Sequence, residues 1–210
     1  WWGDNKKLDF ARGYHIEYWG GMGQPSYGAG GSMDSMRKYL KDEFGNPSPN
    51  GGYGEGLKKD IRRIYGSTLG MSGRGESIPQ YTNYCEIDPN TVDKYGIPVL
   101  RFHYKWTDQE IKQAKHMQDT FEEILTNAGA TLLGTKPGPE SMYGLAAPGR
   151  IIHEVGTTRM GTNAKTSVVN SNCQAHDCKN VFVVDAGPFV SQADKNPTWT
   201  ILALSWRTSE

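Results

Sequence analysis

The chain has 210 residues, which is enough for one large domain or two small ones. Lys and Arg together number 23, and so do Asp and Glu, so the zero formal net charge gives no indication of charge-driven binding to nucleic acid or membrane surfaces. No apolar run reaches the length of about eighteen residues that a transmembrane helix requires. The 26 Gly, 11 Tyr and 6 Trp residues are typical of a loop-rich protein with an aromatic-lined binding surface.

The first hundred residues contain many glycines and prolines between short periodic stretches. Residues 10–19 alternate large apolar and polar side chains, and Gly20 and Gly21 follow, which predicts a strand that ends at the glycines. Composition and spacing also predict glycine-rich loops at 22–31 and 45–56, a short helix at 32–44, and a short helix or strand at 57–65. Residues 85–106 predict a strand, an Asp88-Pro89-Asn90 turn and a second strand. Gly96 and Pro98 bound the second strand on its N-terminal side.

An amphipathic helix is predicted from about residue 108 to residue 128. Thr107 and Glu110 form a T-x-x-E capping box, and Gly129 provides the stop signal. The apolar residues recur at spacings of three or four, which predicts a buried stripe with His116 on the polar side. That stripe consists of Ile111, Ala114, Met117, Phe121, Leu125 and Ala128.

The last sixty residues predict a short buried strand and a buried helix. NVFVVDAG at 180–187 is an apolar run ended by Asp185 and Gly187, which is typical of a buried strand. Asn196 is a preferred N-cap, Pro197 suits the first turn, and TWTILALSW is apolar on nearly every face. A buried helix N-terminus has unpaired N–H groups and partial positive charge, so we expect an electron-rich partner there unless Asn196 alone caps it.

The positions of the cysteines and of two histidines leave their roles open. Cys85, Cys173 and Cys178 are an odd and sparse set, so no disulfide framework is implied. Cys173, His176 and Cys178 lie close together, as in half of a metal site or a small disulfide loop, but the four-ligand spacing of a zinc site is missing, and ordinary loop cysteines are favoured. His153 follows two isoleucines; by itself, such a histidine is more often a hydrogen-bonded core residue than a catalyst.

Four segments in order resemble the C-terminal signature of the glucose–methanol–choline oxidoreductases. They are HEVGTTRMG at 153–161, SVVN at 167–170, NVFVVDAGPF at 180–189 and NPTWTILALSWRTSE at 196–210. Upstream, residues 93–117 resemble the segment that precedes this signature in sugar-oxidising members. Within the family, FAD-dependent dehydrogenases of sugars and glycosides, including glucoside 3-dehydrogenases, are the most similar.

The resemblance implies a role for each matching residue. His153 corresponds to the active-site base, which takes a hydroxyl proton as hydride leaves the adjacent carbon for flavin N5, and Asn196 corresponds to the second catalytic residue, which orients the substrate oxygen. Asp185, Ala186 and Gly187 match the strand end that contacts the flavin ribityl and pyrophosphate groups. Pro197 and Thr198 match the helix start beneath the isoalloxazine ring. The cofactor expected from these matches is FAD.

The expected fold class is α/β, with an α+β substrate-domain sheet and the C-terminal portion of a Rossmann-like FAD-binding domain. Residues 1–150 are assigned mainly to the substrate-binding domain and residues 151–210 to the FAD-binding domain. The family's G-x-G-x-x-G segment has no match here, and the chain opens at Trp1 without an initiator Met, so we expect the ADP-binding half to come from upstream sequence or a companion chain.

The predicted function is oxidation of a sugar or glycoside secondary alcohol to a ketone in the periplasm. A small subunit and a cytochrome c electron acceptor are the expected partners. Three other functions remain open. The first is an oxygen-using alcohol or pyranose oxidase, and the second is a noncatalytic carbohydrate-binding subunit that keeps the signature for packing. The third is a zinc protein using Cys173, His176 and Cys178.

Overall fold

The computed structural model describes residues 7–20, 55, 58–59, 62, 66, 69–132 and 134–210. The predicted loop at 22–31 and helix at 32–44 lie outside these residues. The only described residue of the predicted loop at 45–56 is Glu55, which is helical, and so are the three described residues of 57–65: Lys58, Lys59 and Arg62.

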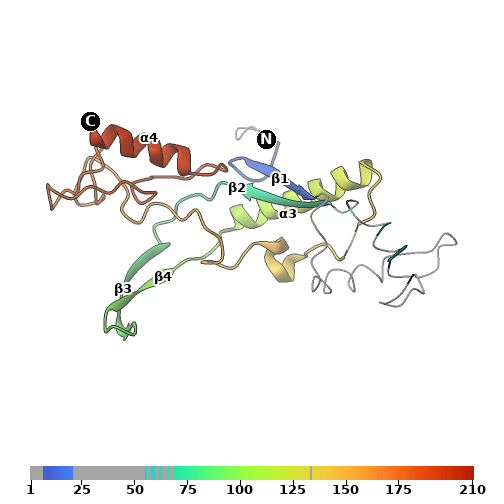
Figure 1. Cartoon of the computed structure of the whole chain (residues 1–210), viewed down its shortest axis with the longest axis horizontal. Coiled ribbons are helices and arrows are strands. Elements are labelled where there is room, and N and C mark those ends of the chain that lie inside the picture. The colour runs from blue at the N-terminus through green and yellow to red at the C-terminus, as the bar shows by residue number, and fades with distance from the viewer. Residues whose placement is uncertain are drawn as a thin grey trace. The chain divides into compact units, whose positions relative to one another are not determined.

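Six regular elements and one 3-10 segment follow along the described chain (Figure 1). They are β1 (Tyr14–Gly20), β2 (Leu69–Gly75), β3 (Tyr84–Val92), β4 (Pro98–His103), α3 (Asp108–Asn127), the 3-10 segment η1 (Pro139–Gly144) and α4 (Thr198–Ser209). The strands form two small sheets, β1–β2 and β3–β4, so the described chain is a small α/β structure. Its contacts divide it into two compact units, one made of 1–15, 74–117 and 137–210 and the other of 16–73 and 118–136. The predicted functional boundary at residue 150 stays a prediction.

The strand predicted at residues 10–19 is confirmed as β1, and the segment before it packs on α3. Tyr14 Oη lies 2.8 Å from His116 Nδ1, and the Phe10 and His116 ring centroids are 5.3 Å apart. The prediction that His116 lies on the polar side of the helix is therefore wrong. Helical spacing alone could not show that Phe10 and Tyr14, about a hundred residues earlier, cover that side.

The predicted pair of strands is confirmed as an antiparallel β3–β4 hairpin, but the predicted turn is misplaced. Asp88-Pro89-Asn90 lies inside β3, where the pairing is irregular between Ile87 and Val92. The chain reverses at 93–97, where Asp93 N–H donates to the Ile97 carbonyl at 2.8 Å and Gly96 has φ +80°. Asp88 Oδ1 accepts from the Asn90 and Thr91 amides, so this local turn bends the strand without reversing it.

Helix α3 confirms the predicted capping. Thr107 N–H donates to Glu110 Oε2 at 2.8 Å, and Gln109 N–H donates to Thr107 Oγ1 at 3.3 Å. At the other end Gly129 has φ +73°, and Ala130 N–H donates to the Leu125 carbonyl at 2.9 Å, as in a Schellman motif. Both ends of the helix are therefore fixed by local hydrogen bonds.

The buried face of α3 differs in part from the predicted stripe. Ala114 and Met117 are buried as predicted, but Ile111 and Phe121 are only half-buried. Glu110 and Gln113 are buried instead, because the neighbouring backbone supplies partners for their polar atoms. Gln113 Nε2 donates to the Gly13 carbonyl at 3.2 Å, and a side chain added at Gly75 would meet Gln113 Oε1 at 1.8 Å.

Two predictions of burial near the C-terminus are wrong within the described structure. Residues 180–187 form no strand, only an isolated bridge between Gln174 and Phe182. The predicted helix is confirmed as α4, but Trp199 is 85% exposed and Trp206 is 70% exposed. Apolar composition indicates that a segment tends to be buried, but it does not identify the surface that covers it, and no described residue covers these rings.

Glu110 generates a stability prediction because its carboxylate joins residues 77–78 to the start of α3. Ile78 N–H donates to Oε1 at 3.0 Å and Thr107 N–H to Oε2 at 2.8 Å, and the side chain of Ser77 also reaches Oε1 at 3.3 Å. Burial acts to raise the pKa of Glu110, but the hydrogen bonds from Thr107 and Ile78 outweigh it and lower that pKa.

Glu110→Gln is expected to lower the free energy of unfolding by roughly 1.5 to 3 kcal/mol at pH 7, because charge-assisted hydrogen bonds are lost. The folded-state pKa is depressed, so this contribution is present above the ordinary Glu pKa of about 4.3 and is lost as the pH falls through the folded-state value. Denaturant melts between pH 7 and pH 3 measure both effects. Glu123→Gln on the exposed side of α3 is the control, and an equal response of the two variants would contradict the prediction.

Candidate active site

Three backbone hydrogen bonds join the segment after His153 to residues 186–188. The Gly156, Thr158 and Met160 amides donate to the carbonyls of Ala186, Gly187 and Pro188 at 3.3, 3.2 and 2.9 Å. We call this contact between 156–160 and 186–188 the seam. It brings two segments of the C-terminal signature side by side, and Met160 at its end also forms a bridge with the buried Val169.

Gly187 permits close packing at the seam. Its N–H donates to Asp185 Oδ1 at 2.7 Å. A Cβ atom at this position would lie 2.1 Å from Thr158 Oγ1 and 2.9 Å from Asp185 Oδ1, which is closer than nonbonded atoms can approach. Only glycine therefore fits here without a shift of the Thr158 or Asp185 side chain.

Thr158 Oγ1 is a buried polar atom without a hydrogen-bond partner in the described part of the chain. A buried polar atom without a hydrogen-bond partner typically lowers stability by about 1 to 3 kcal/mol. The Thr158 hydroxyl lies against Gly187, which belongs to the segment that the sequence predicts to contact FAD. The unpartnered Thr158 hydroxyl therefore fits contact with a polar group of a cofactor. Sequence reasoning did not select Thr158, although it lies within the quoted signature HEVGTTRMG.

His153 has a backbone conformation that is uncommon for a residue with a side chain. Its φ is +87°, in the region that favours glycine. Strained conformations of this kind are concentrated at functional sites. Its side chain is half-buried, and its ring makes no hydrogen bond to any residue that the structure describes. The ring is therefore not committed to a structural partner among them.

The start of α4 differs in detail from the prediction. The helix begins at Thr198, and Pro197 (φ −80°), not Asn196, occupies the N-cap position without a side-chain capping bond. The prediction of Asn196 as N-cap is wrong because the first carbonyl to accept an α4 amide is that of the buried Pro197, from Ile201 N–H at 3.0 Å. Asn196 is exposed, so its amide is accessible at the surface of the described chain.

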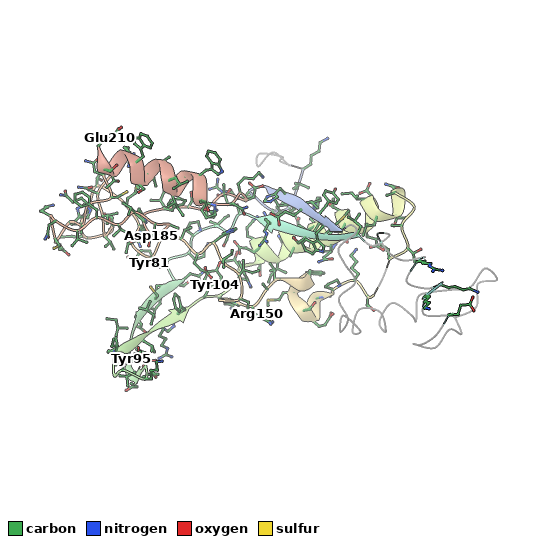
Figure 2. All side chains as sticks on the ribbon, in the orientation of Figure 1. Tyr81, Tyr95, Tyr104, Arg150, Asp185 and Glu210 are labelled. Atoms are coloured by element: carbon green, nitrogen blue, oxygen red, sulfur yellow. The ribbon has the colours of Figure 1, made fainter. Side chains whose placement is uncertain are left out.

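The structure brings some of the predicted site residues together. The His153 segment and Asp185–Gly187 meet through the seam, and Asp185 is labelled in Figure 2 among the irregular segments that accompany α4. The side chains of Arg207 and Thr208 tie α4 to the carbonyls of Ser171 and Asn172. No hydrogen bond between described residues joins His153 to Asn196, so their convergence on one substrate stays a prediction.

A family model described as GMC oxidoreductase matches residues 79–205. The chain belongs to the GMC oxidoreductase family. The resemblance noted from the sequence is confirmed, and it covers the seam, both candidate catalytic residues and the start of α4.

Named relatives include dehydrogenases and an oxidase. The chain is 30% identical to a gluconate 2-dehydrogenase flavoprotein from Pantoea cypripedii over 79% of this chain and 27% of that protein. It is 32% identical to a C-glycoside 3-oxidase from Arthrobacter globiformis over 72% of this chain and 28% of that protein. It is 25% identical to a fructose dehydrogenase large subunit from Gluconobacter japonicus over 75% of this chain and 27% of that protein. The chain thus spans less than a third of the length of these relatives.

Among the described residues, no group of three or more His, Cys, Asp or Glu residues is placed to hold a metal ion. Cys173 is buried and Cys178 is exposed, and His176 Nε2 lies 3.0 Å from Ser167 Oγ. None of the described helices has the length and apolar composition needed to cross a membrane.

Gly187→Ala is expected to destabilise the protein by roughly 1 to 3 kcal/mol, because the added methyl group would overlap the Thr158 hydroxyl. Denaturant melts measure the loss. Thr158→Ala removes the overlapping oxygen. Gly187→Ala should therefore cost much less stability in the Thr158→Ala background than in the wild-type protein. Additive losses in the double variant would contradict the packing described for the seam.

Proposed function

We propose that the protein carrying this chain is an FAD-dependent oxidoreductase that oxidises a secondary alcohol of a sugar or glycoside to a ketone. The observation that supports this most strongly is the seam, which holds the His153 segment against Asp185–Gly187 in a chain of the GMC family. The names of the relatives favour a sugar-like substrate, since they refer to gluconate, a C-glycoside and fructose.

FAD would be held by residues on both sides of the seam and at the start of α4. In this proposal Asp185, Ala186 and Gly187 contact the ribityl and pyrophosphate groups. Asn196, Pro197 and Thr198 would contact the isoalloxazine ring. The N-terminus of α4 has no side-chain cap, so its N–H groups and partial positive charge suit the electron-rich part of the ring. Bound flavin supplies a two-electron acceptor for hydride.

His153 would take the proton of the substrate hydroxyl, and Asn196 would orient the oxygen. Imidazole can accept a proton near neutral pH, and the His153 ring has no competing partner among the described residues. The carboxamide of Asn196 can donate an N–H group to the substrate oxygen without changing charge. The pair therefore divides proton abstraction and orientation between two side chains.

The complete enzyme would need the ADP-binding half that the sequence analysis expects elsewhere, and we propose a periplasmic location with a small subunit and a cytochrome c acceptor. The relatives named as a flavoprotein and as a large subunit support a multi-chain assembly. A second candidate is an oxidase, favoured by the likeness to the C-glycoside 3-oxidase. Steady peroxide formation from sugar in air would favour the oxidase. Sugar binding without flavin reduction would favour a noncatalytic carbohydrate-binding subunit.

His153→Ala in the complete flavoprotein is expected to slow flavin reduction by sugar at least about a hundredfold while FAD stays bound, because the positioned base is lost. Asn196→Ala is also expected to slow it, and the double variant should lose less than the product of the single losses. Stopped-flow absorbance at saturating sugar measures these rates. A His153→Ala enzyme reduced at close to the wild-type rate would eliminate the proposed base.

A further inference from the structure

A contact between distant parts of the chain fixes the residues just before Asn196. His15 Nδ1 lies 3.1 Å from Asp194 Oδ2, and 179 positions separate the two residues. Their side chains are 24% and 20% exposed, so the pair is largely shielded from solvent. Lys195 Nζ also contacts Asp194 Oδ2. We call the His15–Asp194 contact the tether.

The His15 end of the tether follows a well-fixed segment. The Gly13 carbonyl accepts from Glu76 N–H at 3.2 Å and from Gln113 Nε2 at 3.2 Å. Gln109 Nε2 donates to the Ala11 carbonyl at 2.6 Å, and Tyr14 is only 2% exposed. His15 therefore extends from a backbone that α3 and residue 76 hold in place.

The Asp194 end belongs to a short loop that leads into α4. Gln192 Nε2 donates to the Lys195 carbonyl at 2.6 Å, which closes the loop on itself. Pro197 is buried and α4 begins at the next residue. Asn196 lies between Asp194 and Pro197, so its backbone is held from both sides although its side chain is exposed.

The protonation of the tether follows from its chemistry. Partial burial acts to raise the pKa of Asp194, but hydrogen bonds from Lys195 and His15 outweigh it and lower that pKa. An ionised carboxylate only accepts hydrogen bonds, so His15 Nδ1 carries the proton and donates it. Lys195 is adjacent in sequence and moves with the loop, whereas His15 comes from outside the loop and can restrain it.

We propose that His15 is a positioning residue for Asn196, which it restrains through the hydrogen bond to Asp194 and the closed loop 192–196. This inference rests on the proposed function, in which Asn196 orients the substrate oxygen. A small displacement of an orienting group lowers the rate of the chemical step more than it lowers substrate binding. The tether therefore links the segment packed on α3 to the geometry of the active site.

The test uses the complete flavoprotein and three variants. His15→Ala removes the donor, and His15→Gln retains an N–H donor. His103→Ala is the matched control, because His103 Nε2 lies 2.8 Å from Glu86 Oε1 in the β3–β4 hairpin and forms a pair of the same chemistry. Hydrogen–deuterium exchange of residues 192–196 reports the restraint, and stopped-flow flavin reduction with glucose, gluconate and a phenyl C-glucoside reports the chemistry.

His15→Ala is expected to raise exchange in 192–196 and to slow flavin reduction at saturating sugar by roughly tenfold, with little change in the sugar concentration for half-maximal rate. His15→Gln should recover part of both effects, and His103→Ala should change neither. When combined with Asn196→Ala, His15→Ala should add little further loss, because both changes act on the same group.

Several outcomes would overturn the inference. Unchanged exchange in both His15 variants would show that the tether does not restrain the loop. Raised exchange with an unchanged reduction rate would show that the restraint does not serve Asn196, and so would a fully additive loss with Asn196→Ala. Failure of the proposed function looks different, since wild-type flavin would then remain oxidised with every sugar, and the role of His15 in catalysis would fail with it.

Discussion

Three backbone hydrogen bonds at the seam are the constraint on which the candidate site depends. They hold 156–160 beside 186–188, although none of these residues belongs to a regular strand or helix. At position 187 only glycine avoids an overlap with the side chains of Thr158 and Asp185. His153, with its unusual φ of +87°, lies three residues before the first hydrogen bond of the seam.

Two buried polar groups, on Glu110 and Thr158, differ in whether they have hydrogen-bond partners among the described residues. The buried carboxylate of Glu110 accepts hydrogen bonds from Ile78 and Thr107, so its burial is compensated. The Thr158 hydroxyl is also buried, but it has no partner in the part of the chain that is described. Uncompensated groups are rare in stable cores, and this one lies where the family resemblance places a cofactor.

Local sequence signals predicted the elements well, whereas burial and long-range contacts were harder to predict. Capping residues and apolar spacing identified α3 because both depend on neighbours within a few positions. The turn at Asp88 and the environment of His116 were mispredicted because a bulge and a distant segment decide them. Apolar composition suggested burial for α4, but it does not identify a covering surface.

In the candidate site, too, residues within local motifs could be predicted, whereas long-range contacts could not. His153, Asn196 and Asp185–Gly187 could be selected because they lie in motifs that resemble a family signature. The tether between His15 and Asp194 has no local pattern, since the two residues are 179 positions apart and each is ordinary in its own segment. Thr158 could have been noticed within its motif, but only the structure shows that its hydroxyl is buried.

The most direct test of this account is a crystal structure of the complete flavoprotein with a nonreactive sugar analogue bound. The account predicts that one sugar oxygen lies within about 3.2 Å of both a His153 ring nitrogen and the Asn196 side chain. It also predicts that the three hydrogen bonds of the seam are intact beside the flavin. A sugar bound away from His153, or a flavin distant from Asp185–Gly187, would contradict the account.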